Sequence, residues 1–126
     1  MSFTQTPATT AAMLAGVLAL LDNDTDPAYA VLFDAASNPL VTVIFDQPAG
    51  AIVAGQLVFA QGDPAGDLIA ASGTAVSFTL HAGDGTNMGA GDVTDAAGTG
   101  AMKLEGSTGT TIYAGGRLVI NELTMG

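Results

Sequence analysis

The stretch AVSFTLH, residues 75–81, decides the fold class. Its apolar and polar side chains alternate, with Val76, Phe78 and Leu80 expected on one face and Ser77, Thr79 and His81 on the other. Such a period of two is typical of an antiparallel strand that has one face on the core and one face in solvent. We therefore predict a β domain whose core includes the three apolar side chains of this strand.

Turn-forming residues divide most of the remaining chain into further short strands. Clusters of Gly, Pro, Asn, Asp and Ser at 37–39, 47–50 and 61–66 predict turns. The predicted strands are 29–34, 40–45, 52–60, 93–96, 101–105, 111–113 and 117–123. Seven or eight strands at this spacing are typical of an antiparallel β-sandwich or a jelly-roll-like barrel.

Two places rich in glycine need a separate interpretation. Gly55 lies inside the predicted strand 52–60, where a glycine indicates a bulge or a close backbone approach. The segment from Gly83 to Gly91 has four glycines among its nine residues and predicts a long exposed loop with Met88 at its tip.

The first segment has a different period and predicts a helix over residues 7–21. Thr6 suits the N-cap position, and Pro7 suits the first helical position because its missing N–H has no partner there anyway. The apolar side chains are broadly distributed, and the remaining side carries small residues instead of charges: Thr9, Ala12, Gly16 and Ala19. A helix without a charged face is normally covered on more than one side. We expect one domain over residues 1–126, made of a helical arm at 1–21 and a β domain at 28–126.

The charge balance excludes several classes of partner. Of 126 residues, 12 are Asp or Glu, and Lys103 and Arg117 are the two cations, which gives a formal net charge of −10. Two cations cannot displace enough counterions to hold nucleic acid, and the same deficit disfavours an anionic membrane surface. The apolar run 11–21 is too short to span a bilayer and has no basic residue before it, so we expect neither a membrane anchor nor a signal peptide.

The residue types that carry chemistry form no known catalytic or metal-binding pattern. The chain has no cysteine, so disulfides and thiolate metal sites are excluded. Asp22, Asp24 and Asp26 begin like a calcium loop, but an EF-hand needs Gly and Glu where this chain has Pro27 and Phe33. Ser77 and His81 would lie about 13 Å apart on one strand, too far for a catalytic pair. We expect no enzyme activity, no cofactor and no metal site.

Two stretches resemble small virion proteins of long-tailed bacteriophages. The first is Val76–Gly85, a strand followed by the turn Gly83-Asp84-Gly85. The second comprises Lys103–Thr110 and Ala114–Ile120, which are similar to the closing "L-x-G-(S/T)…aG…v-x-I" stretch of those proteins. The resemblance implies a non-enzymatic virion protein, with capsid decoration (cement) as the first expectation. It also implies location on the capsid surface after synthesis in the host cytoplasm, and contact with the major capsid protein or other virion proteins.

Two alternatives stand beside that expectation: a tail or head–tail connector component, and a β-type module that binds glycan or calcium. Only 11% of residues are charged, against about a quarter in typical soluble domains, so we also predict self-association, as a homotrimer. The residues expected to form the attachment surface come from the helix and from the predicted loop: Met13, Leu14, Val17, Leu18, Leu21 and Met88.

Overall fold

The computed structural model describes residues 6–106 and 109–125. Residues 1–5 of the predicted arm lie outside the described residues. Ser107 and Thr108 of the second phage-like stretch, and Gly126, lie outside them as well. The described elements are α1 (Pro7–Leu21), β1 (Tyr29–Phe33), β2 (Pro39–Val53), β3 (Gln56–Gln61), β4 (Asp67–Leu68), β5 (Gly73–Thr74), β6 (Ser77–His81), β7 (Asn87–Asp95), β8 (Met102–Leu104), β9 (Thr111–Ile112), β10 (Arg117–Leu118) and β11 (Ile120–Met125).

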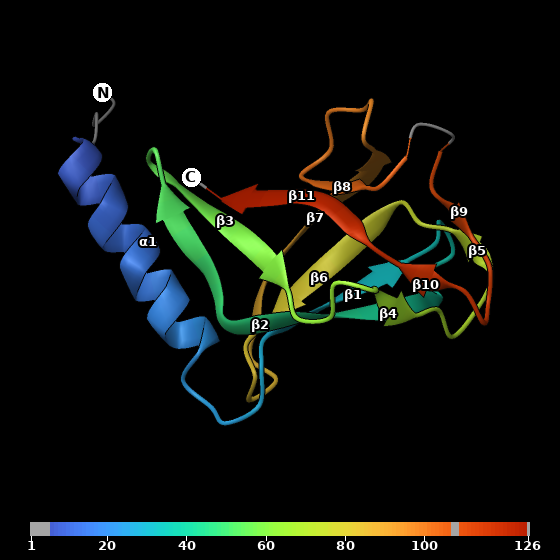
Figure 1. The fold of residues 1–126 in the computed structure, drawn as a ribbon, viewed down its shortest axis with the longest axis horizontal. Coiled ribbons are helices and arrows are strands. Elements are labelled where there is room, and N and C mark those ends of the chain that lie inside the picture. Colours follow the sequence, from blue (N-terminus) through green and yellow to red (C-terminus); the bar gives the residue numbers. More distant parts are fainter. Residues whose placement is uncertain (1–5, 107–108, 126) are drawn as a thin grey trace.

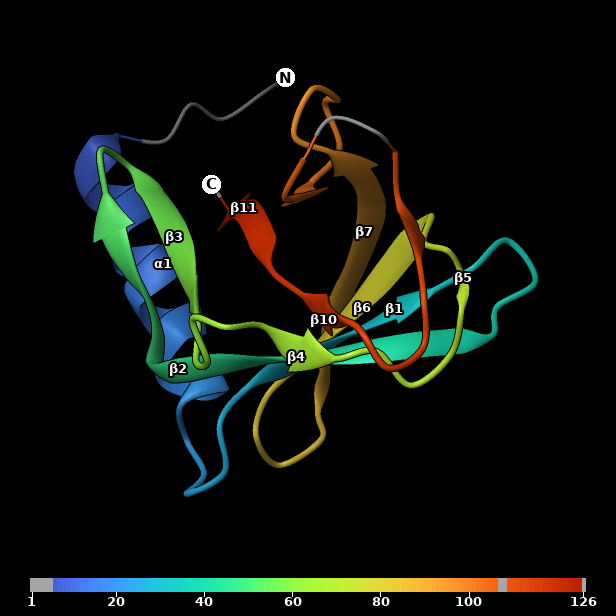
Figure 2. The ribbon, with the colours of Figure 1, turned by 45° about the vertical axis from the view of Figure 1, so that its right-hand side comes forward.

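Seven of the strands close into a barrel in the order β1-β2-β3-β11-β8-β7-β6. Two small sheets, β4 with β10 and β5 with β9, lie on the side of the barrel away from α1 in the view of Figure 1, and Figure 2 shows β4 and β10 in front of the barrel. The prediction of a mainly β domain with one N-terminal helix is confirmed. The antiparallel expectation needs one correction, because β7 and β8 pair in parallel from Val93 and Met102 onward.

Helix α1 begins and ends where local chemistry predicts. The Thr6 hydroxyl accepts a hydrogen bond from the Thr9 backbone N–H at 3.3 Å, and Pro7 follows it. At the other end, the Asp22 backbone N–H donates to the Leu18 carbonyl at 3.0 Å. The helix packs against β2 and β3, which form a hairpin between it and the rest of the barrel (Figures 1 and 2).

The β2–β3 hairpin overturns two predicted boundaries. The segment 47–50 was expected to break the strand, yet β2 continues through it to Val53, with a register shift between Phe45 and Gly50. The true turn is Ala54-Gly55, where both residues have positive φ (51° and 81°), as a two-residue hairpin turn of type I′ requires. Gly55 therefore reverses the chain and is not a bulge within a strand.

The strand that decided the fold class is β6, and its facing is nearly as predicted. Phe78 and Leu80 are buried, while Ser77, Thr79 and His81 are half-buried on the outer side. The prediction that Val76 is buried is wrong, because Val76 lies before β6 and its side chain is 40% exposed. The buried residue at that point is Ala75, so the alternation changes phase between Ala75 and Phe78.

The predicted loop from Gly83 to Gly91 is mostly strand. The turn is confined to residues 82–86, and β7 begins at Asn87. Gly89 and Gly91 pair with Leu80 and Phe78 on β6, and a side chain at Gly91 would come within 2.8 Å of the Phe78 ring. Gly91 makes room for the Phe78 ring, and Gly89 has a positive φ of 145° that favours glycine, so both glycines belong to a strand and not to a loop.

Phe78 gives a direct test of this facing. Phe78→Ala leaves a void among buried side chains, and such truncations typically cost about 3–5 kcal/mol, out of the roughly 5–15 kcal/mol that a domain possesses. Thr79→Ala, on the outer side of the same strand, should change the free energy of unfolding by less than about 1 kcal/mol. Urea denaturation of both variants measures the difference, and a larger loss for Thr79→Ala would contradict the described facing.

Candidate attachment surface

Helix α1 carries no charged residue and has two different sides. On the inner side, Leu14 and Leu21 are buried, and Val17 and Leu18 are half-buried against the same core. These positions follow the helical spacing i, i+3, i+4 and i+7, so one continuous stripe packs on the β2–β3 hairpin. The inner side therefore belongs to the fold.

The opposite side of α1 faces outward, and we call its exposed residues the outer helix face. They are Ala8, Thr9, Ala12, Met13, Ala15, Gly16, Ala19 and Leu20. Met13 is 54% exposed and Leu20 42% exposed. A Cβ atom built on Gly16, between them, would meet nothing within 4 Å. Apart from the Thr9 hydroxyl, the described face is thus apolar, and it is uncharged and exposed.

The six residues expected to form an attachment surface do not lie together. Met13 is the one member on the outer helix face, whereas Leu14, Val17, Leu18 and Leu21 form the inner stripe. Met88 lies half-buried on β7 and packs against the core, not at a loop tip. Sequence reasoning left Leu20 out of the candidate set, although its spacing of seven residues from Met13 places both on one side of a helix.

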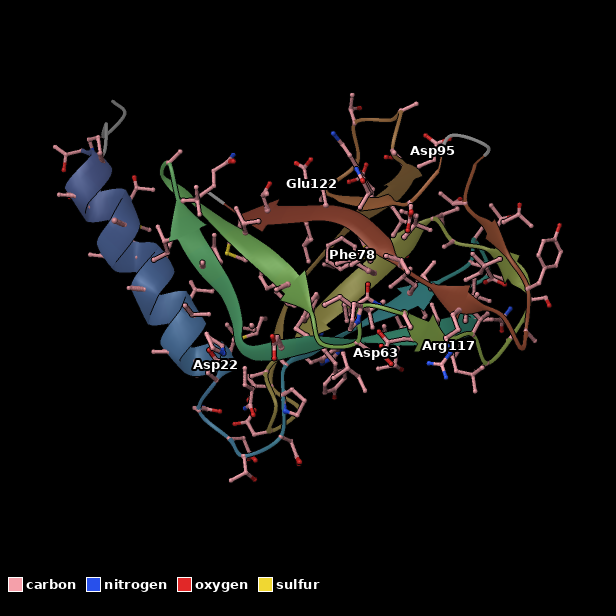
Figure 3. The ribbon with its side chains drawn as sticks, viewed as in Figure 1. Asp22, Asp63, Phe78, Asp95, Arg117 and Glu122 are labelled. Carbon is pink, nitrogen blue, oxygen red and sulfur yellow. The ribbon has the colours of Figure 1, made fainter. Side chains whose placement is uncertain are left out.

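The Asp22 carboxylate and the backbone carbonyls that follow it tie the end of the helix to the hairpin. The Ala49 backbone N–H donates to both oxygens of Asp22, at 3.1 and 3.3 Å. Asp24 accepts from the Asp26 backbone N–H at 3.1 Å, and Gln47 donates to the carbonyls of Asp24 and Asp26. Figure 3 shows Asp22 at the end of α1, beside the hairpin. In the turn after the helix, Asp22 and Asp24 therefore use their carboxylates as hydrogen-bond acceptors, and Asp26 takes part through its backbone.

No group of three or more His, Asp or Glu side chains within residues 6–106 and 109–125 is arranged to hold a metal ion. His81 instead joins a local set of contacts at the end of β6. Its Nδ1 lies 3.4 Å from the Gly85 carbonyl oxygen, and its Nε2 lies 2.8 Å from the Thr79 hydroxyl oxygen. The ring also stacks on Tyr29, with centroids 4.9 Å apart.

The two cations lie away from the outer helix face. In the described part of the chain, the one ion pair joins Arg117 to Asp63 at 3.7 Å, and both side chains are about half exposed (Figure 3). Exposed pairs of this kind contribute little to stability. Lys103 is half-buried on β8, opposite Glu122 on β11. Helix α1 has no basic residue of its own, and the chain as a whole has a net charge of −10.

Asp84 fixes the turn between β6 and β7. The Thr86 backbone N–H donates to its carboxylate at 2.9 Å. This hydrogen bond is the largest cause that lowers the pKa of Asp84 below its usual value, and the side chains of Thr86 and Asn23 act in the same direction. The turn thus connects the barrel to the segment after α1.

Among the described residues, no helix is both long and apolar enough to cross a membrane. Comparison with protein-family models, with curated proteins and with solved structures found no match.

Gly16→Ala tests whether α1 is formed and open on its outer side. Glycine inside a helix is about 1 kcal/mol less favourable than alanine, and the new methyl group would meet no neighbour. We expect the thermal midpoint of Gly16→Ala to rise. An unchanged or lower midpoint would show that this position is frayed or covered.

Asp84→Asn tests the charge at the β6–β7 turn, since the amide oxygen can still accept the Thr86 hydrogen bond. A carboxylate with a lowered folded-state pKa stabilises the fold above its unfolded-state pKa, about 3.9. That stabilisation is lost as the pH falls through the folded-state value. Urea midpoints measured from about pH 7 to about pH 2 should show a wild-type advantage that shrinks with acidification. An advantage that grows on acidification would contradict the assignment.

Proposed function

We propose that the chain is a non-enzymatic structural protein of a bacteriophage virion, and specifically a capsid decoration (cement) protein. In this proposal the outer helix face attaches to the major capsid protein on the outer head lattice. The single observation that supports it most is an uncharged, exposed helix face in a chain of net charge −10. Apolar surface left exposed on one helix side is typical of a contact with other protein.

The physical argument concerns desolvation. Removing a charged group from water is expensive unless it gains a partner, whereas apolar and small side chains lose little. Met13 and Leu20 offer side-chain area for burial, and Ala12, Gly16 and Ala19 allow another backbone to approach closely. The inner stripe already holds α1 on the hairpin, so a partner can dock without unfolding the helix.

Self-association into a homotrimer is a further part of the proposal and needs a different surface. Val53 and Val58 on the β2–β3 hairpin are 56% and 38% exposed, and the strand register places both on one face of the hairpin. They provide apolar contact area that leaves the outer helix face free for the lattice. Analytical ultracentrifugation over a range of concentrations measures this step separately.

The test of attachment uses paired charges on the outer helix face. Met13→Lys with Leu20→Lys should weaken binding to purified heads that lack this protein by at least tenfold, because burying two ammonium groups opposes docking. Both positions are exposed, so the free energy of unfolding should change little. Co-sedimentation with the heads measures the binding.

Val76→Lys is the matched control, because Val76 is 40% exposed but lies on the barrel before β6. It should bind the heads like the wild type. An equal loss of head binding in both variants would contradict attachment through the outer helix face. A wild-type protein that does not bind heads would contradict the decoration role itself. Ring-shaped assemblies of the purified protein would support a tail or connector component instead. Specific retention of glycan or calcium would support a binding module.

A further inference from the structure

A cavity of about 230 Å³ opens at the barrel near the end of β11. Its large lining side chains come from four strands: Phe59 on β3, Phe78 and Leu80 on β6, Met88 on β7, and Leu123 and Met125 on β11. Figure 3 shows Phe78 projecting from β6 into the space enclosed by the barrel. The cavity lies within the fold and is separate from the outer helix face.

The cavity exists because β7 is poor in side-chain volume. Gly89 and Gly91 pair with Leu80 and Phe78, so two large side chains face positions without a side chain. The Phe78 ring fills the space at Gly91, but the remaining room near Gly89 is bordered by the half-buried Met88 and Met125. Methionine is flexible and polarisable, which suits a border that must adapt to an occupant.

The chemistry of the lining limits what can enter. Of the described residues that line the cavity, none is charged, and Thr124 carries the one polar side chain. An anionic ligand would find no cation there and would approach a chain of net charge −10. An apolar cavity of about 150 Å³ holds benzene, so this larger cavity has room for a two-ring aromatic molecule or a short alkyl chain.

We propose that this cavity is a binding site for a small, neutral, apolar molecule of about two aromatic rings or the equivalent alkyl chain. The site does not depend on the proposed virion role, because it lies on other residues and needs no assembly. Burial of the ligand against Phe59 and Phe78 supplies the binding energy. The size of the cavity sets the upper limit on the ligand.

The experiment uses the methionine methyl groups of the full chain as reporters and naphthalene as the probe. Met88 and Met125 line the cavity, whereas Met13 is exposed on α1 and Met102 is fully buried without lining it. In carbon-13 methyl-labelled protein, naphthalene should shift the Met88 and Met125 resonances to saturation and leave those of Met13 and Met102 unchanged. Naphthalene-2-sulfonate, the same ring system with a negative charge, should bind at least tenfold more weakly.

A cavity-filling variant completes the test. Ala101 lines the cavity beside Gly91, and Ala101→Phe should weaken naphthalene binding at least tenfold. Ala97→Phe, at an exposed position that does not line the cavity, is the matched control and should bind like the wild type. If a variant fails to fold, the comparison of naphthalene with naphthalene-2-sulfonate on the labelled wild-type protein still tests the proposal.

Three results would overturn the proposal. The first is the absence of saturable shifts up to the solubility of naphthalene. The second is equal shifts at Met13, Met88, Met102 and Met125. The third is movement of the Met88 and Met125 resonances on dilution without probe, which would show that a second copy of the chain fills the cavity. Equal binding of the sulfonate would overturn the restriction to neutral ligands.

Discussion

Strand β2 joins the barrel and the helix into one structure. Its first part pairs with β1, from Pro39 to Ile44, and its last part pairs with β3, from Gly50 to Val53. Between these parts, the Ala49 backbone N–H is held by the Asp22 carboxylate at the end of α1. At Gly50 the strands come so close that a side chain would collide with the Val58 carbonyl oxygen. The position of α1, the hairpin and the closure of the barrel therefore all depend on a few residues in the middle of β2.

Local chemistry was enough to predict α1 and most of β6. A helix start needs an N-cap and an acceptable first residue, and Thr6 with Pro7 provides both within two positions. The alternation in β6 shows which side chains are buried because Phe78 and Leu80 have polar neighbours on both sides. In these two elements the deciding interactions lie within a few residues of one another in the sequence.

The errors arose where distant partners decide the structure. Gln47-Pro48-Ala49-Gly50 has the composition of a turn but stays in β2. The Ala49 N–H donates to the Asp22 carboxylate, the Gln47 side chain donates to the Asp24 carbonyl, and Gly50 pairs with β3. The glycines at 89 and 91 are typical of a loop, but both belong to a strand because they pair with Leu80 and Phe78 on β6. The parallel pairing of β7 with β8 likewise depends on tertiary packing, since the short connection between them carries no sequence signal for it.

The same limit applies to the candidate surface. Both sides of α1 are apolar or small, so helical spacing separates the stripe with Leu14 and Leu21 from the stripe with Met13 and Leu20 but does not say which one packs inward. On an ordinary amphipathic helix, charged residues would mark the solvent side. Here the packing of α1 on the β2–β3 hairpin, and the hydrogen bond between the Ala49 N–H and the Asp22 carboxylate, decide which stripe faces inward.

The distribution of charge separates two ways in which this chain can contact a partner. Asp22, Asp24 and Asp26 follow α1 at the negative end of its dipole, where carboxylates are unfavourable, whereas the outer helix face has no charge. Salt shortens the electrostatic range from about 10 Å at 0.1 M to about 3 Å at 1 M. It would therefore weaken a contact that depends on these carboxylates and leave a contact through Met13 and Leu20 nearly unchanged. Salt also screens the repulsion between chains of net charge −10. A partner held by the outer helix face should thus stay bound at an ionic strength that screens the repulsion between copies of this chain.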